Sequence, residues 1–115
     1  MYILHIETST TMCSVALSKD NDCIFSVSNN EGMNHAALLS LFIKEALDKL
    51  DGLHQKLNAI AVSSGPGSYT GLRIGVSTAK GLCYGYDIPL IAVSTLETMT
   101  LAALETITET EKTLF

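Results

Sequence analysis

A glycine-rich segment that follows an apolar strand constrains the fold of this chain most strongly. The run AIAV at residues 59–62 predicts a buried strand, and the motif SSGPGSYTGLRIG follows directly at 63–75. The next residues are expected to be helical, although a glycine inside a helix costs about 1 kcal/mol relative to alanine. Glycine nevertheless recurs through that predicted helix, at Gly71, Gly75, Gly81 and Gly85. We therefore expect a phosphate, a closely packed helix, or both to approach the backbone there.

Short turns between the first strands determine how the sheet begins. Apolar and alternating residues predict strands over 2–6, 13–18 and 23–28. The polar turn at 19–22 is too short for a parallel crossover, so we expect an antiparallel meander. This meander excludes a Rossmann-like sheet.

The remaining elements alternate between helices and strands. Asn34 is the expected N-cap of a helix over 35–50, and we expect Asp51-Gly52 to end it. The later elements are a strand at 58–63, a helix at 69–85, a strand at 90–93, and a helix from Ser94 or Thr95 to about residue 107.

The order βββαβαβα predicts an α/β fold with a mixed five-stranded sheet and helices packed on it. This is the arrangement of the ribonuclease-H-like domain in actin-like ATPases, the ASKHA fold. We assign residues 1–107 to this domain. The polar residues 108–115 are expected to be a tail or a truncated linker to a second domain.

Composition narrows the class of protein. The 115 residues are 47% hydrophobic, which is typical of a globular domain. The net charge of −5, with seven basic against twelve acidic residues, argues against direct nucleic-acid binding. We find no basic leader and no apolar run near the about 18 residues that span a membrane, so we expect a cytoplasmic protein. The three cysteines lack zinc-site spacing and are expected to be buried free thiols: Cys13, Cys23 and Cys83.

Two segments are candidates for facing a nucleotide. The glycine-rich loop matches neither GxxxxGK[ST] nor GxGxxG, which leaves generic anion binding at a helix N-terminus. The acid and hydroxyls that end the first strand could hold a metal-bound water and phosphate, or form a hydrogen-bonded turn. The glycines around Pro66 could equally serve a turn with positive φ. The nucleotide-facing candidates are Glu7, Thr8, Ser9, Thr10, Gly65 and Gly67.

Catalytic and metal-binding patterns are lacking in the sequence. His5, His35 and His54 are solitary and form no HxxxH or HExxH motif. Ser64 or Ser68 could join a distant histidine and aspartate, but no GxSxG elbow supports a hydrolytic triad. We therefore predict no catalytic residue, no metal site and no cofactor in this chain.

The two helices suggest a surface for a partner. On the helix over 35–50, one apolar face suits the sheet, comprising Ala36, Leu39, Ile43, Ala46, Leu47 and Leu50. Other apolar residues form a second face, and small residues four apart form a smooth ridge on the helix over 69–85. The predicted interface residues are Leu38, Leu41, Phe42, Gly71, Arg73, Gly75 and Ala79. Packing on a neighbouring helix of the same chain is the alternative for the second face.

With these motifs the chain resembles the TsaB family, also called YeaZ, of the bacterial pathway to tRNA threonylcarbamoyladenosine. The resemblance rests on residues 3–10, 14–17, 64–75, 79–82 and 93–97. It implies the N-terminal half of a two-domain actin-like fold that scaffolds and activates TsaD without catalysing the reaction itself. TsaD is the transferase that attaches threonylcarbamoyl to an adenosine of tRNA. The TsaE ATPase joins that pair, and the resemblance places ATP, ADP and metal on partner subunits.

The resemblance also implies where a partner binds. In the family, the helices after the meander and after the glycine loop pack on their counterparts in another subunit, which is TsaD or, without TsaD, a second copy. This agrees with the predicted interface residues. On this interpretation, Gly75→Leu is expected to abolish pairing and to leave the fold largely intact.

Two departures from the family pattern bear on ligand binding. Glu7 stands where the family commonly has aspartate, which weakens any metal role, and the second half of the two-domain fold is expected to be missing, so we expect this chain by itself to bind nucleotide weakly or not at all. Residues 34–39 also hold one histidine where TsaD-like proteins have a pair. Two rival interpretations remain at this stage. One is an actin-like nucleotide-binding hydrolase or peptidase, the old glycoprotease label, and the other is an RNA-binding module.

Overall fold

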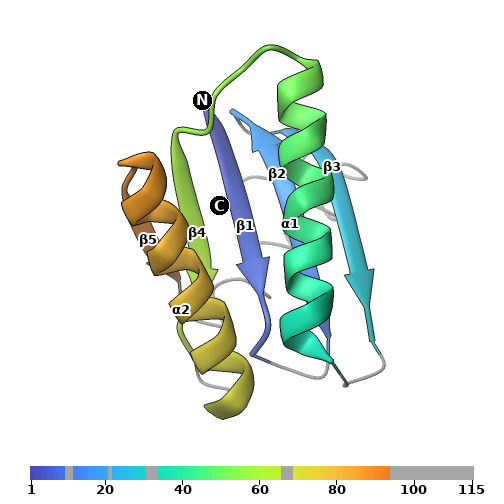
Figure 1. Ribbon diagram of the computed structural model, residues 1–115, viewed down its shortest axis with the longest axis vertical. Helices are drawn as coiled ribbons and strands as arrows, with labels where there is room; N and C mark the ends of the chain where they lie inside the picture. The colour runs from blue at the N-terminus through green and yellow to red at the C-terminus, as the bar shows by residue number, and fades with distance from the viewer. Residues whose placement is uncertain (10–11, 21, 31–33, 66–68, 94–115) are drawn as a thin grey trace, which may run out of the picture.

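A five-stranded mixed sheet carries two helices on one of its faces (Figure 1). The computed structural model describes residues 1–9, 12–20, 22–30, 34–65 and 69–93. The elements, in chain order, are β1 (Tyr2–Glu7), β2 (Cys13–Lys19), β3 (Asp22–Asn29), α1 (His35–Gly52), β4 (Ala59–Ser63), α2 (Tyr69–Tyr86) and β5 (Leu90–Val93). Each lies within two residues of its predicted bounds. The predicted last helix and the boundary at 107/108 lie outside the described residues.

The strand order is β3-β2-β1-β4-β5, which confirms the predicted mixed sheet. β1, β2 and β3 pair antiparallel, as short turns require. β4 runs parallel to both β1 and β5, with Ile6 opposite Val62 and Val62 opposite Ala92. The carboxyl ends of β1, β4 and β5 therefore meet at one edge of the sheet. Ligand sites of open α/β sheets commonly form at such an edge.

The core lies between the sheet and the two helices. Alternate residues of the strands point into it, so the inner side chains of β1 and β2 are fully buried while their neighbours are not. Among the largest fully buried side chains are Leu4, Leu17, Leu39 and Ile60. Burial of a leucine or isoleucine side chain contributes about 1.5–3 kcal/mol relative to exposure, which makes this layer the main source of stability.

The face of the sheet that points away from the helices is less apolar than the core face. β1 and β2 present smaller and more polar side chains there, such as Ser14, Ala16 and Ser18. His5 lies on this face, and its Nε2 is 2.9 Å from the Ser18 hydroxyl. Partial desolvation lowers the pKa of the His5 imidazole below its ordinary value. His5 thus links two neighbouring strands, as expected of a structural histidine.

The ends of α1 lie close to the prediction, but their capping differs. Asn34 is the N-cap, but it adopts a left-handed backbone (φ 57°) and its side chain makes no capping hydrogen bond. Its carbonyl instead accepts from the Leu38 amide at 2.9 Å. Asp51 and Gly52 belong to the helix, and His54, with φ 57°, takes the left-handed position after it. Asn34 is thus the N-cap, as predicted, although its side chain makes no cap, and the helix ends at Gly52, within the predicted stop at Asp51-Gly52.

The inner face of α1 also differs from the prediction. Phe42, expected on an outer face, is only 6% exposed and belongs to the core. Ala36, expected on the inner face, is exposed. Leu38 is half-buried against the core, and Leu41 is 51% exposed. Because the buried residues follow the spacing 39, 42, 43, 46 and 50, one apolar stripe accounts for nearly all of them. A continuous second apolar face is therefore not present on this helix.

The three cysteines occupy two environments. Cys13 and Cys83 are buried, as predicted, whereas Cys23 is exposed, so the prediction is wrong for that residue. Desolvation raises the pKa of the Cys13 and Cys83 thiols above the ordinary value. The raised pKa lowers the fraction of thiolate at neutral pH, and burial keeps reagents away from the sulfur atoms.

We expect one thiol per folded chain to react quickly with a disulfide reagent at neutral pH. Cys23 should account for this fast phase, and Cys23→Ser should remove it. Cys13 and Cys83 should react only as the domain opens. The rates follow from absorbance after mixing native protein with the reagent, with the urea-unfolded chain as the three-thiol reference. Two or three fast thiols in the native chain would contradict the burial of Cys13 or Cys83.

Candidate functional site

The glycine-bearing face of α2 lies directly on the sheet. Gly75 is buried, and a Cβ atom at this position would overlap the Thr8 hydroxyl oxygen. The same atom would lie 3.6 Å from methyl carbons of both Ile6 and Val62, which is ordinary contact. α2 therefore approaches the ends of β1 and β4 closely because residue 75 has no side chain.

A hydrogen bond fixes the first turn of α2 at the same place. The Thr8 hydroxyl donates to the Gly71 carbonyl at 2.6 Å, and Thr8 is 1% exposed. Ala79, one turn beyond Gly75, is fully buried in the core. Gly71, Gly75 and Ala79 thus share one helix face, as predicted, but that face packs on the sheet of this chain. Their prediction as intersubunit interface residues is wrong.

The polar residues that end β1 and β4 bond to one another. The Ser9 amide donates to a carboxylate oxygen of Glu7 at 2.8 Å, and the Ser9 hydroxyl donates to the same oxygen. The Ser63 hydroxyl, at the end of β4, lies 3.3 Å from the Ser9 hydroxyl. Ser9 and Ser63 are 1% and 4% exposed and Glu7 is half-buried, so these groups form a partly buried network at the carboxyl edge of the sheet.

This network bears on the predicted nucleotide-facing residues. Thr8 and Ser9 are buried with partners inside the chain, so a soluble nucleotide meets neither hydroxyl unless the turn opens. Gly65 adopts a φ of 115°, which confirms the expected positive φ at that glycine. Thr10 and Gly67 lie outside the described residues. A nucleotide-facing role for the set, Glu7 and Gly65 included, stays a prediction.

Within the described ranges, no three histidine, cysteine or acidic side chains come together in a way that could hold a metal ion. The same ranges contain no helix long and apolar enough to cross a membrane.

An open groove of about 330 Å³ lies beside the first half of α2. Its wall from α1 is Ala36, and the rest of its lining comes from α2. Arg73 stands at this groove with an exposed side chain. The complete lining is Ala36, Thr70, Arg73, Ile74, Ser77 and Thr78. Of these, only Arg73 was among the predicted interface residues.

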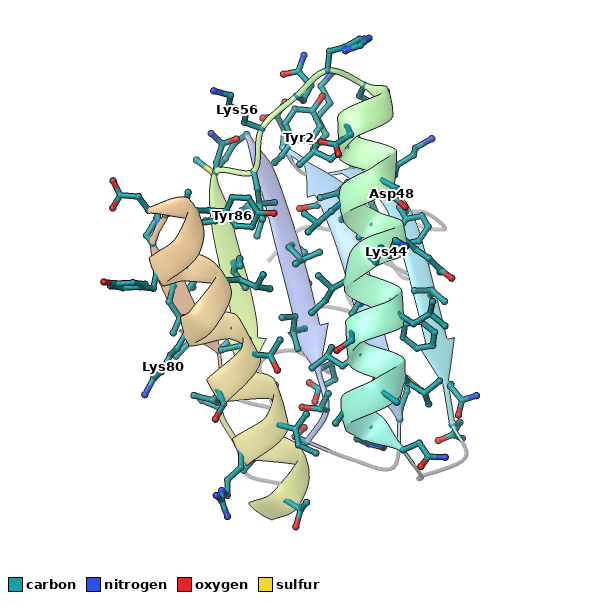
Figure 2. The ribbon with its side chains drawn as sticks, viewed as in Figure 1. Tyr2, Lys44, Asp48, Lys56, Lys80 and Tyr86 are labelled. Carbon is teal, nitrogen blue, oxygen red and sulfur yellow. The ribbon has the colours of Figure 1, made fainter. Side chains whose placement is uncertain are left out.

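Beyond the groove, the outer side of α2 carries two glycines and the 91% exposed side chain of Tyr84. Gly81 and Gly85 are exposed, and a Cβ atom at either would meet nothing within 4 Å. Gly81 lies four residues after Ser77 and seven after Ile74, which places it on the same side of the helix as the groove. Farther around the helix, Lys80 projects away from the sheet (Figure 2). The glycines that face outward are therefore those of the second half of α2.

Sequence reasoning missed Ala36, Thr70, Ser77 and Thr78 because small and hydroxyl residues carry no strong pattern of their own. A usable signal was nevertheless present. The series 71, 75, 79 and 83 ends in a cysteine and excludes charge, whereas residues on the opposite side of the helix are polar. That contrast separates a buried side of the helix from an exposed side, although it does not say what covers the buried side.

Fold and site together define a class. A sheet ordered β3-β2-β1-β4-β5, with an antiparallel meander, two parallel additions and both described helices on one face, is a ribonuclease-H-like domain of the actin-like ATPase type. The family model for TsaD, tRNA N6-adenosine threonylcarbamoyltransferase, matches residues 29–113.

Comparison with individual relatives shows which family within this class the chain resembles. The tRNA threonylcarbamoyladenosine biosynthesis protein TsaB of Bacillus subtilis is 40% identical over 99 residues, covering 86% of this chain and 43% of the relative. TsaB of Escherichia coli is 40% identical over 101 residues, covering 86% and 42%. The tRNA N6-adenosine threonylcarbamoyltransferase of B. subtilis is 34% identical over 109 residues, covering 81% and 32%.

A solved structure agrees with these relatives. YeaZ from Pseudomonas aeruginosa superposes with a TM-score of 0.69 at 33% identity, covering 81% of this chain and 43% of that chain. The chain therefore belongs to the TsaB (YeaZ) family, and its domain is the one that the TsaD model describes. It spans a little under half the length of the curated TsaB relatives that it matches.

Proposed function

We propose that this chain is a non-catalytic subunit of tRNA threonylcarbamoyladenosine biosynthesis that binds and activates a TsaD-type transferase. The observation that carries the proposal is the open groove between α1 and the first half of α2. Small and hydroxyl side chains line most of it, so a partner helix can approach closely without displacing bulky groups. The names of the relatives support the pathway, and the geometry supports a role in binding.

The polar network at the carboxyl edge of the sheet fits this assignment. Glu7, Ser9 and Ser63 satisfy one another, and Thr8 is bonded to α2. The Ser9 amide and hydroxyl both donate to one carboxylate oxygen of Glu7, and these bonds stabilise the turn that follows β1. We therefore assign them a structural role, and we place ATP, ADP and metal on partner subunits, among them a TsaE-type ATPase.

The interface residues proposed from sequence are revised accordingly. Leu41 and Arg73 remain, because both side chains are exposed. The groove adds Ala36, Thr70, Ile74, Ser77 and Thr78, and the exposed side of α2 beyond it adds Gly81. The same surface would pair two copies of the chain when no transferase is present. We place the protein in the cytoplasm, where tRNA is modified.

Filling the groove should abolish binding without unfolding the chain. Ser77 is exposed, so Ser77→Trp should keep the circular dichroism and melting temperature of the wild type. A tryptophan there stands where the partner helix packs, and we expect the dissociation constant for a TsaD-type transferase to rise roughly 100-fold. Calorimetric titration of the purified proteins measures this change.

The matched control places the same side chain elsewhere. Ser26 is exposed on β3, at the far edge of the sheet from α2, and Ser26→Trp should bind as the wild type does. If the wild-type chain fails to bind a TsaD-type transferase, or if Ser77→Trp binds as tightly as Ser26→Trp, the groove is not the docking surface. Hydrolysis of ATP or a peptide by the wild-type chain alone would favour the hydrolase interpretation.

A further inference from the structure

We propose that Thr8 is a positioning residue for α2. Its hydroxyl occupies the space that Gly75 leaves empty, holds the Gly71 carbonyl, and thereby fixes where the partner-binding side of α2 lies. Neither the pathway nor the family name assigns this task to the end of β1. For its consequence on partner binding, the inference rests on the function proposed above.

The contact between Thr8 and Gly71 depends on the absence of a side chain at Gly75. In an α-helix the carbonyl of residue 71 already accepts the amide of residue 75, so the Thr8 hydroxyl is a second donor to that oxygen. It can reach the carbonyl, at 2.6 Å, only because residue 75 has no Cβ in its path. The contact joins residues 63 positions apart and is buried. A hydrogen bond in such surroundings has no competing water.

The contact lies at the place that decides the shape of the groove. Gly71 is in the first turn of α2, and Gly75 follows one turn later. Arg73, Ile74 and Ser77 lie between or just beyond them and line the groove on the outer side of the helix. Any movement of this part of α2 relative to β1 therefore moves the groove lining relative to Ala36 on α1.

A double-mutant cycle in the free chain tests whether residues 8 and 75 are coupled, and it needs no partner protein. The obstacle to a Cβ at residue 75 is the Thr8 oxygen alone, because Ile6 and Val62 stand at ordinary contact distance. Gly75→Ala should therefore lower the melting temperature in the wild-type background. In a Thr8→Ala background the same change should leave the melting temperature unchanged or raise it, because alanine is the better helix former. An equal loss in both backgrounds would overturn the inference.

Partner binding tests whether the contact positions the groove or only stabilises the fold. Thr8→Val keeps the side-chain shape and removes the donor, whereas Thr8→Ser keeps the donor. We expect Thr8→Val to weaken binding to a TsaD-type transferase roughly tenfold, and Thr8→Ser to stay within about twofold of the wild type. Hydrogen exchange of amides 71–75 in the free chain should be faster in Thr8→Val only.

A matched control variant separates the effect of lower stability from a direct effect on partner binding. Val27 packs on the core from β3, far from α2, so Val27→Ala should destabilise the domain and leave binding by the folded protein unchanged. If Thr8→Val and Val27→Ala bind equally well when both are folded, Thr8 is merely structural and the inference is wrong. A wild-type chain that does not bind the transferase would instead refute the proposed function, while the cycle and the exchange rates would still decide the role of Thr8.

Discussion

Replacing Gly75 with leucine should strongly destabilise this domain. The first atom of the new side chain would overlap the Thr8 oxygen, and the remaining three carbons would have to enter a layer already filled by Ile6 and Val62. Overpacking a core typically costs about 1–3 kcal/mol, and here it also removes the buried bond from Thr8 to Gly71. Total stabilities of native domains are only about 5–15 kcal/mol. Circular dichroism and urea titration should show unfolding at a much lower urea concentration than in the wild type.

Gly81 supplies the control for this prediction. It lies in the same helix, but a Cβ atom there meets nothing within 4 Å, so Gly81→Leu should fold with wild-type or slightly higher stability. From sequence alone, Gly75→Leu was expected to abolish pairing and spare the fold. A Gly75→Leu chain with a native urea midpoint would support that earlier expectation and would place this face of α2 away from the sheet.

The order and type of the elements were predictable because local chemistry decides them. Alternating residues in β2, the continuous apolar run of β4 and the short polar turn between β2 and β3 each permit one interpretation. The short turn in turn requires an antiparallel start, and helices between later strands require parallel additions. These constraints predict a mixed sheet, and the order of its strands comes from the structure.

What each helix face packs against was less predictable, as Gly71, Gly75 and Ala79 show. Four-residue spacing establishes that three residues share a helix face, but it does not say what lies opposite. A smooth face suits a neighbouring subunit and a sheet of the same chain equally well. The deciding contact is between Thr8 and Gly71, which are 63 residues apart, and no local pattern reports such a pair.

The hydrogen bonds among the polar residues at the ends of β1 and β4 were also not predictable from the sequence. An acid and hydroxyls at the end of a strand are typical of a phosphate or metal site, and Glu7 with Ser9 fits that pattern in sequence. In the fold, the Ser9 amide and hydroxyl both donate to the Glu7 carboxylate, and the Ser63 hydroxyl lies beside Ser9. The residue types were identified correctly, but their partners depend on the register between β1 and β4.

Leu41 and Phe42 are neighbours on α1 with opposite surroundings, so truncating each to alanine should give very different results. Phe42 is 6% exposed and packs in the core, whereas Leu41 is 51% exposed. Phe42→Ala should lower the free energy of unfolding by about 3–5 kcal/mol, because it loses buried area and leaves a cavity. Leu41→Ala should change it by less than about 0.5 kcal/mol. Urea titration of both variants measures the difference.

The comparison also separates stability from partner binding on this helix. If Leu41 contacts a TsaD-type transferase, Leu41→Ala should weaken binding while the urea midpoint stays at the wild-type value. Phe42→Ala should shift the midpoint, and its binding should recover wherever enough of the chain is folded. Equal and small effects of both changes on unfolding would mean that α1 is rotated relative to the sheet. In that case Phe42 would lie on the outer face, as the sequence predicts, and Ala36 would leave the groove.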